Sequence, residues 1–202
     1  MNPNSLKIGI FASGAGTNAL AIIEASKASD SYYSVALIIS NNEQPGIRQI
    51  AEQNRIPFVY VKMTKDVDLQ ELTSELMSLL QKYGVDVIAL CGFMKLIPTG
   101  IVRAFPERIL NIHPALLPDY GGKGMFGMNV HMAVINDKKP LSGATVHFVD
   151  EIYDHGRALA QIKVQIERHF TPEILSEEVK RAEHIIYPKV LNQVCKIIYA
   201  HR

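Results

Sequence analysis

The chain has 202 residues, of which 48% are hydrophobic and 20% are charged, and its formal net charge is +1. This length and composition predict one soluble domain over residues 1–202. The balanced, dispersed charge argues against a nucleic-acid or membrane-surface partner, because such partners select clustered charge.

The first half of the chain alternates short apolar runs with longer amphipathic segments. The apolar runs predict strands at residues 7–12, 34–40, 58–62, 85–90 and 108–112. The intervening segments predict helices at residues 18–25, 45–54, 69–83 and 98–105. This alternation is typical of a parallel sheet covered by helices on both faces.

The pattern changes after residue 113. A long glycine-rich loop covers residues 114–129, and a short helix is expected around 129–136. Residues 145–149 and 158–166 predict two strands that we expect to join the same sheet. Thr171 and Pro172 predict a helix start that leads towards Tyr199, with a kink at Pro188. The expected fold class is therefore α/β, with a mostly parallel sheet and helices on both faces.

The loop after the first predicted strand reads Ser-Gly-Ala-Gly-Thr-Asn at residues 13–18. Its glycines let the backbone approach a ligand, and the following helix start offers free N–H groups and a positive dipole end. These features predict a site for a phosphate monoester. The alternative is a plain strand-to-helix turn, since glycine-rich loops occur in many folds. No Gly-Lys-Ser/Thr follows, so the loop is not a Walker A motif.

Polar side chains gather at predicted strand ends in the second half. Asn111 and His113 close the fifth strand and lie on the same side of it, with Ile112 opposite. Ligands in open α/β sheets sit at this carboxyl edge, and a carboxamide with an imidazole can stabilise an oxyanion and handle a proton. Asp154 follows another strand, and a carboxylate near His113 would favour the protonated imidazole. The alternative is that these side chains only cap turns.

Metal binding and thiol chemistry are both disfavoured. His147 and His155 flank Asp154, but no HExxH motif or Cys/His pair accompanies them, so we expect no metal. Cys91 and Cys195 are far apart, which indicates a reducing compartment, and Cys91 is expected to be a buried, inert thiol. Residues 1–6 lack the features of a signal peptide, and no run reaches the ~20 apolar residues of a membrane helix. We expect a cytoplasmic protein, either a monomer or a homodimer.

Taken together, five segments resemble the folate-dependent formyltransferases over nearly the whole chain. The segments are SGAGTN at 13–18, CGFMKLI at 91–97, LNIHPALLP at 110–118, GATVHFVDEIYDHG at 143–156 and AEHIIYP at 182–188. The first of them points to the branch that acts on glycinamide ribonucleotide. The resemblance implies a Rossmann-like formyltransferase fold and transfer of the formyl group of 10-formyltetrahydrofolate to the amine of that ribonucleotide, a step of purine biosynthesis.

The resemblance also implies roles for individual residues. Residues 1–100 would form the nucleotide- and phosphate-binding half, and residues 101–202 the catalytic and folate-binding half. The implied site residues are Asn111, His113 and Asp154 for catalysis, Gly16, Thr17, Asn18 and Glu183 for the ribonucleotide, Met94, Lys95 and Leu96 for the folate, and His147 in support.

Some positions depart from the family pattern. The loop at residues 119–127 is longer than expected, and His131 is the nearest candidate for a histidine often seen there. Lys95 stands where an arginine is common, which keeps the charge but loses the planar fork. His155 and Arg157 replace residues of the usual DGGP run, which changes the wall of the folate pocket. We expect the glycine-rich loop to close over the folate.

Other activities remain as alternatives. A hydrolase would use water in place of the amine, but its family members carry NIHH where this chain has NIHP. Formyl transfer to a charged tRNA calls for a further domain and a basic surface, and transfer to an amino-sugar nucleotide is a third possibility. A catalytically idle folate- or nucleotide-binding protein is disfavoured by the intact Asn111, His113 and Asp154.

Overall fold

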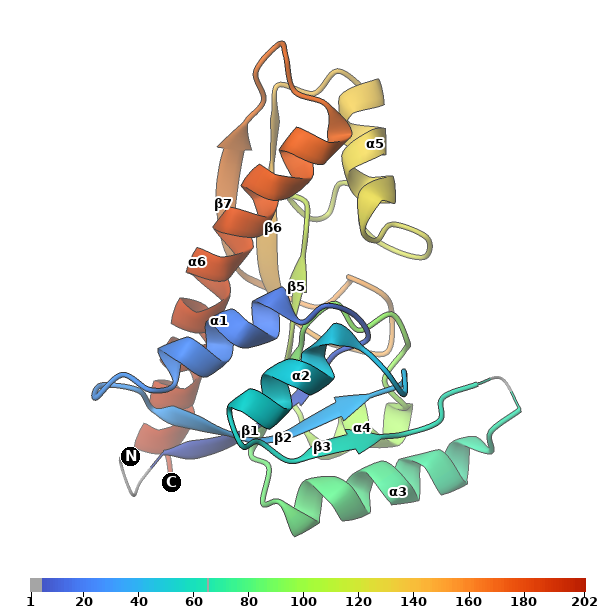
Figure 1. Cartoon of the computed structure of the whole chain (residues 1–202), viewed down its shortest axis with the longest axis vertical. Helices are drawn as coiled ribbons and strands as arrows, with labels where there is room; N and C mark the ends of the chain where they lie inside the picture. Colours follow the sequence, from blue (N-terminus) through green and yellow to red (C-terminus); the bar gives the residue numbers. More distant parts are fainter. Residues whose placement is uncertain (1–4, 65) are drawn as a thin grey trace.

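The computed structural model describes residues 5–64 and 66–202, and seven strands of this part form one sheet. The strands are β1 (Leu6–Phe11), β2 (Tyr33–Ser40), β3 (Phe58–Tyr60), β4 (Val87–Leu90), β5 (Ile109–His113), β6 (Leu141–Phe148) and β7 (Ala158–Gln165). Their order is β3-β2-β1-β4-β5-β6-β7. Strands β1 to β5 are parallel, whereas β6 pairs antiparallel with both β5 and β7 (Figure 1). The expected α/β class and the attachment of the closing strand pair are confirmed.

Helices cover both faces of this sheet. They are α1 (Thr17–Ala25), α2 (Gly46–Gln53), α3 (Leu69–Lys82), α4 (Thr99–Ala104), α5 (Met128–Asn136) and α6 (Pro172–Ala200). Buried side chains of α1, α2, α5 and α6 belong to one core cluster, and those of α3 and α4 belong to the other. The sheet therefore separates two apolar layers, as the buried parallel strands require.

Local signals in the sequence explain where α3 and α6 begin. The Asp68 carboxylate accepts hydrogen bonds from the first backbone amides of α3, and Leu72, Leu76 and Leu80 then bury one face of the helix. Thr171 caps α6 in the same way, with Pro172 in the first turn. Pro188 lies inside α6, and the helix continues through it to Ala200, although proline removes one backbone donor there.

The differences from the expected boundaries are small, and the largest concerns β6. This strand begins at Leu141, four residues before the expected start at Thr145. Residues 142–144 are buried and pair with β7, but Ser142 and Gly143 carry little β signal. Pairing with β7 is thus what extends the strand.

The order of the strands determines where a ligand can bind. The chain order reverses between β1 and β4, which lie side by side in the centre of the sheet. At such a switch point the loops after neighbouring strands diverge and leave a crevice at the carboxyl edge. The loops after β1, β4 and β5 all lie at this edge.

Within the described residues, no helix is long and apolar enough to span a bilayer.

Candidate active site

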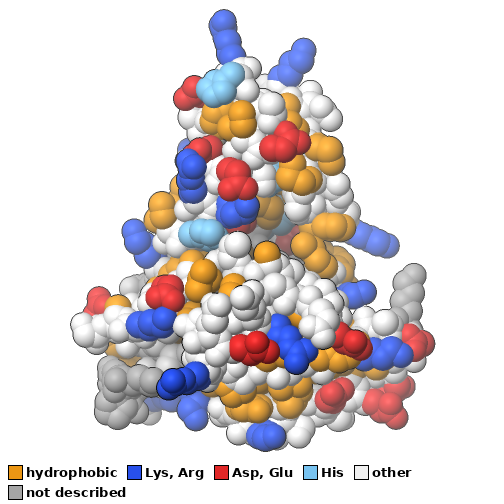
Figure 2. All heavy atoms as spheres, in the orientation of Figure 1, with side chains coloured by type: hydrophobic (Ala, Val, Ile, Leu, Met, Phe, Trp, Pro, Cys, Tyr) orange, Lys and Arg blue, Asp and Glu red, His pale blue; other side chains and the backbone are white. Residues whose placement is uncertain are grey.

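A cavity of about 460 Å³ opens at the carboxyl edge of the central strands. Its wall comes from the segment after β4, the end of β5, the glycine-rich loop, the loop after β6, and from α5 and α6. Figure 2 shows hydrophobic side chains gathered on the right-hand side of the molecule, at and below α5. Exposed Met94, Leu96, Phe126, Ile152 and Tyr153 line the cavity. This apolar part of the wall suits an apolar portion of a ligand.

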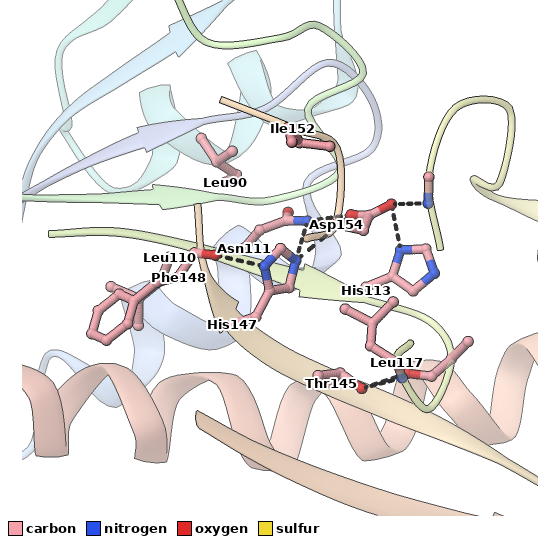
Figure 3. Close-up of polar contacts among 12 residues, drawn as sticks. Leu90, Leu110, Asn111, His113, Leu117, Thr145, His147, Phe148, Ile152 and Asp154 are labelled. Carbon is pink, nitrogen blue, oxygen red and sulfur yellow. Dashed lines mark hydrogen bonds and ion pairs between the residues drawn. The ribbon is translucent and has the colours of Figure 1, made fainter. Parts of the chain in front are cut away.

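Asp154 lies at the centre of a polar network on this wall (Figure 3). Its Oδ2 is 3.4 Å from Nδ1 of His113, and its Oδ1 is 3.6 Å from Nε2 of His147. The Nδ2 of Asn111 donates to Oδ1 at 3.4 Å. Asn111 and His113 come from β5, His147 from β6, and Asp154 from the loop after β6. The structure thus brings together the three residues expected to be catalytic.

His147 fixes the orientation of Asn111. The Nδ1 of His147 donates to the carbonyl oxygen of Phe148 at 2.8 Å, because a carbonyl can only accept. In the neutral ring Nε2 is then an acceptor, and the Nδ2 of Asn111 donates to it at 3.1 Å. The carboxamide therefore presents its N–H groups to the site, and its remaining N–H makes only the long contact with Asp154.

His113 has a partner at each ring nitrogen. Besides the contact of Nδ1 with Asp154, its Nε2 donates to the carbonyl oxygen of Tyr120 at 2.7 Å. The backbone N–H of Gly122 donates to Oδ2 of Asp154 at 3.0 Å. The segment just after His113 is tied to β6, since the Thr145 hydroxyl donates to the carbonyl of Ala115 and accepts from the amide of Leu117.

These contacts keep Asp154 ionised. Burial alone would raise the pKa of its carboxyl group, but the neighbouring His113 and His147 side chains and the hydrogen bond from the Gly122 amide hold that pKa well below its usual range. Asp154 also adopts a left-handed backbone conformation, with φ of 52°. Asp tolerates this conformation better than most residues. Strained backbone of this kind is common at functional sites.

The loop at residues 13–18 lies beside this network. Gly16 is the N-cap of α1, and its φ is 79°. A Cβ there would lie 2.5 Å from Cδ1 of Ile47, so only glycine fits. The first amides of α1, at and after Thr17, precede the helical hydrogen bonds and can bind an anion. Gly16 and Thr17 lie at this helix start, while Asn18 reaches the cavity itself.

Asn18 links this loop to α6. Its Nδ2 donates to Oε2 of Glu183 at 2.9 Å, and both residues line the cavity. Glu183 is only 8% exposed. Burial raises the pKa of the Glu183 carboxyl to about 7, although the hydrogen bond from Asn18 and the nearby His113 oppose this shift. A carboxyl group that titrates near neutrality can accept or release a proton from an amine.

The three residues expected at the folate site line the same cavity. Met94, Lys95 and Leu96 follow β4, and all three are exposed. The Ser13 hydroxyl accepts from the Met94 amide at 3.3 Å and donates to Oδ1 of Asn41 at 2.6 Å. The loop after β1 and the segment after β4 are therefore joined by one hydroxyl group.

Of the remaining candidate residues, one lines the cavity and two lie outside its lining. His131, on α5, lines the cavity and is 3% exposed. Burial, with Lys180 and His113 nearby, lowers its pKa to about 4, so it is neutral. His155 instead contacts Asp150 at 2.6 Å, and Arg157 contacts Glu107 at 2.8 Å. These two pairs brace the loop that carries Asp154.

Two further expectations concern thiol chemistry and metal binding. Cys91 and Cys195 are buried and free, and burial raises the pKa of the Cys91 thiol. A raised pKa keeps sulfur protonated and therefore a poor nucleophile. Within residues 5–64 and 66–202, no three His, Cys, Asp or Glu side chains are grouped so that they could hold a metal ion.

Two backbone groups in the network were not expected from the sequence. They are the carbonyl of Tyr120 and the amide of Gly122, both in the long loop after β5. Main-chain groups are present at every residue, so no residue type marks them. The glycine content of the loop is the only sequence signal that bears on their position.

Comparison with known proteins gives a consistent result. The family model described as "Formyl transferase" matches residues 6–191. A phosphoribosylglycinamide formyltransferase of Bacillus subtilis is 32% identical over 93% of this chain and 94% of its own length. A chloroplastic enzyme of the same name from Arabidopsis thaliana is 43% identical over 96% of this chain. A glycinamide ribonucleotide transformylase from Symbiobacterium toebii has a TM-score of 0.88 and 29% identity, over 96% of this chain and 90% of that structure.

The length of the match differs among these relatives. The chain spans between 61% and 67% of the length of the curated plant relatives that it matches. It spans nearly all of the Bacillus protein.

Proposed function

The chain belongs to the formyl transferase family of enzymes, and we propose that it transfers the formyl group of 10-formyltetrahydrofolate to the amine of glycinamide ribonucleotide in purine biosynthesis. The observation that carries this proposal is the position of Asp154. It contacts Asn111 and His113 on the wall of a cavity that also reaches Asn18 and Glu183. Acyl transfer needs an oxyanion site, a proton carrier and an acceptor amine held nearby, and these groups supply all three.

The substrates follow the two sides of the cavity. We place the ribonucleotide phosphate at the start of α1, on the amides after Gly16 and the side chains of Thr17 and Asn18. Glu183 then lies where it can accept from the amine. The folate occupies the apolar side, along Met94, Lys95 and Leu96, with the Lys95 ammonium group available to the glutamate tail.

The chemistry is a direct transfer without a covalent enzyme intermediate. The ribonucleotide amine attacks the formyl carbon, a new C–N bond forms, and the carbonyl oxygen becomes an oxyanion. Asn111 turns its loosely held N–H from Asp154 to this oxygen, and His113 in its protonated form adds a charged donor. The bond from the formyl carbon to the folate nitrogen then breaks. As it breaks, Asp154 helps to transfer a proton, through water, from the attacking nitrogen to the departing one.

We add to this proposal the absence of a metal, the role of His147, and the location and oligomeric state of the protein. No metal takes part, and His147 acts through Asn111. We place the protein in the cytoplasm and expect a monomer or a homodimer. The plastid, which is named for the plant relatives, is the alternative location, and imaging of a tagged chain would reveal it. Light scattering after size-exclusion chromatography separates the two oligomeric states.

The decisive experiment separates the amine from water as the acceptor. Purified protein is mixed with 10-formyl-5,8-dideazafolate, and deformylation is followed by absorbance with and without glycinamide ribonucleotide. We expect deformylation only when the ribonucleotide is present. Equal rates without it would identify a hydrolase and would remove the assignment of the residue 13–18 loop to substrate phosphate.

A further inference from the structure

The backbone segment at residues 119–122, here called the strap, contacts both His113 and Asp154. The carbonyl of Tyr120 accepts from Nε2 of His113 at 2.7 Å, and the amide of Gly122 donates to Oδ2 of Asp154 at 3.0 Å. A Cβ at Gly121 would lie 2.6 Å from Leu117 and 3.3 Å from the Asp154 Cβ, so the strap lies directly against the catalytic carboxylate. Nothing in the proposed transfer requires these contacts.

The side chain of Tyr120 anchors the strap outside the cavity. Its hydroxyl donates to Oδ2 of Asp137, which ends α5, at 2.6 Å. The Nζ of Lys139 lies 6.0 Å from the centre of the Tyr120 ring and 3.9 Å from Oδ2 of Asp119. Tyr120 also adopts a left-handed conformation, with φ of 56°, which a tyrosine keeps only where its surroundings enforce it.

We propose that Tyr120 is a positioning residue for formyl transfer: its hydroxyl, held by Asp137, fixes its carbonyl against Nε2 of His113 and thereby directs Nδ1 of His113 towards Asp154 and the reacting formyl oxygen. This inference rests on the proposed function. It adds a residue outside the cavity wall to the groups that determine how His113 acts.

The chemistry of the imidazole explains why one carbonyl matters. A carbonyl oxygen accepts and never donates, so Nε2 carries a hydrogen whenever this contact is present. In the neutral ring Nδ1 is then the nitrogen without hydrogen, and Nδ1 is the atom that gains or loses the proton. Without the strap, the neutral ring could adopt the other tautomer, in which Nε2 instead of Nδ1 would gain or lose the proton.

The test removes the anchor and leaves the catalytic side chains in place. Tyr120→Phe keeps the ring over Lys139 but loses the hydroxyl, and Asp137→Ala loses the acceptor. We expect either variant to lower kcat about tenfold, the loss typical of removing a group that orients a catalytic side chain, with both KM values nearly unchanged. The double variant should be no slower than either single one, because both remove the same contact.

Two further variants separate positioning from general destabilisation. Asp137→Asn keeps an acceptor for the hydroxyl, so we expect it to retain most of the turnover. Tyr60→Phe also deletes a tyrosine hydroxyl, but Tyr60 lies on β3 and does not line the cavity, so its turnover should equal that of the unaltered chain. The inference is overturned if Tyr120→Phe and Asp137→Ala both turn over normally, or if only their KM values change.

A spectroscopic readout does not depend on turnover. The ¹⁵N chemical shifts of the His113 ring report which nitrogen carries hydrogen, and we expect the Nε2–H form to lose population in Tyr120→Phe. Unchanged shifts would overturn the inference. If the unaltered chain fails to transfer formyl groups to the ribonucleotide, the proposed function falls, whereas the ring shifts still decide whether Tyr120 governs His113.

Discussion

Asp154 lies among several polar groups, and those that donate hydrogen bonds to it favour its ionised form. Both histidines, the carboxamide of Asn111 and the Gly122 amide face its two oxygens. Its backbone is left-handed, a conformation that Asn also tolerates. Replacement by Asn therefore changes the charge with little change of backbone.

For this reason Asp154→Asn tests the charge alone. We expect the variant to fold normally but to lose turnover by roughly 100-fold or more, the contribution typical of a positioned acid–base group. Circular dichroism checks the fold, and ribonucleotide-dependent deformylation measures kcat. A variant with the kcat of the unaltered chain would show that the carboxylate has no role in the proton transfer.

Glu183 represents the opposite case, a carboxyl group whose ionised form the fold disfavours. Burial raises its pKa from the usual 4.5 to about 7. The protein therefore loses stability as pH rises from below the unfolded pKa through the folded one. Gln keeps an acceptor for Asn18 but cannot ionise, so Glu183→Gln should escape this loss.

The expected result is a difference that depends on pH. We subtract the free energy of unfolding of the unaltered chain from that of Glu183→Gln. This difference should be roughly 3 kcal/mol larger at pH 8 than at pH 4. Urea denaturation at both pH values measures it. Because packing of the amide contributes equally at every pH, a constant difference would refute the raised pKa.

At the scale of elements, regular patterns made much of the site predictable. The alternation of β5 places Asn111 and His113 on one side and buries Ile112 in the core, as the sequence indicates. The contacts of Asp154 depend instead on a loop that folds back across β5. The Tyr120 carbonyl and Gly122 amide enter through that same tertiary arrangement, which no periodicity encodes.

Tyr187 connects three elements next to this site. The residue is fully buried on α6, and its hydroxyl lies 3.0 Å from the carbonyl of Leu90 and 2.9 Å from that of Leu110. These carbonyls belong to β4 and β5, immediately before Cys91 and Asn111. One hydroxyl therefore holds α6 to the end of β4 and to the first half of β5.

Tyr187→Phe removes that hydroxyl and leaves buried carbonyl oxygens short of a donor. We expect a loss of about 1–3 kcal/mol in the free energy of unfolding, the cost of an unsatisfied buried polar group. The denaturant midpoint measures it, with Tyr60→Phe as the control for loss of an exposed residue's hydroxyl. An unchanged midpoint would mean that the Tyr187 contacts contribute no net stability.

At the scale of the whole molecule, one sheet and one of the two core clusters join the two halves of the chain. Residue 100 falls between β4 and β5, which are neighbouring, hydrogen-bonded strands. Side chains from β1, α1, β5, β6 and α6 share a single cluster, and α6 packs against α1 as well as β6 and β7. The proposed phosphate-binding half and the proposed catalytic half are therefore functional regions of one cooperative structure.

The expected consequence is a single unfolding transition. Cutting the structure at residue 100 would expose the edge of β4, the side of α1 that packs against α6 and one wall of the cavity, and it would divide the core cluster that both halves share. In calorimetry the van't Hoff and calorimetric enthalpies should agree, as in two-state domains. Glycinamide ribonucleotide should raise Tm without splitting the transition, since its site draws on both α1 and α6. Two resolved transitions, of which the ligand shifts only one, would show that the halves fold independently and that the ribonucleotide contacts only one of them.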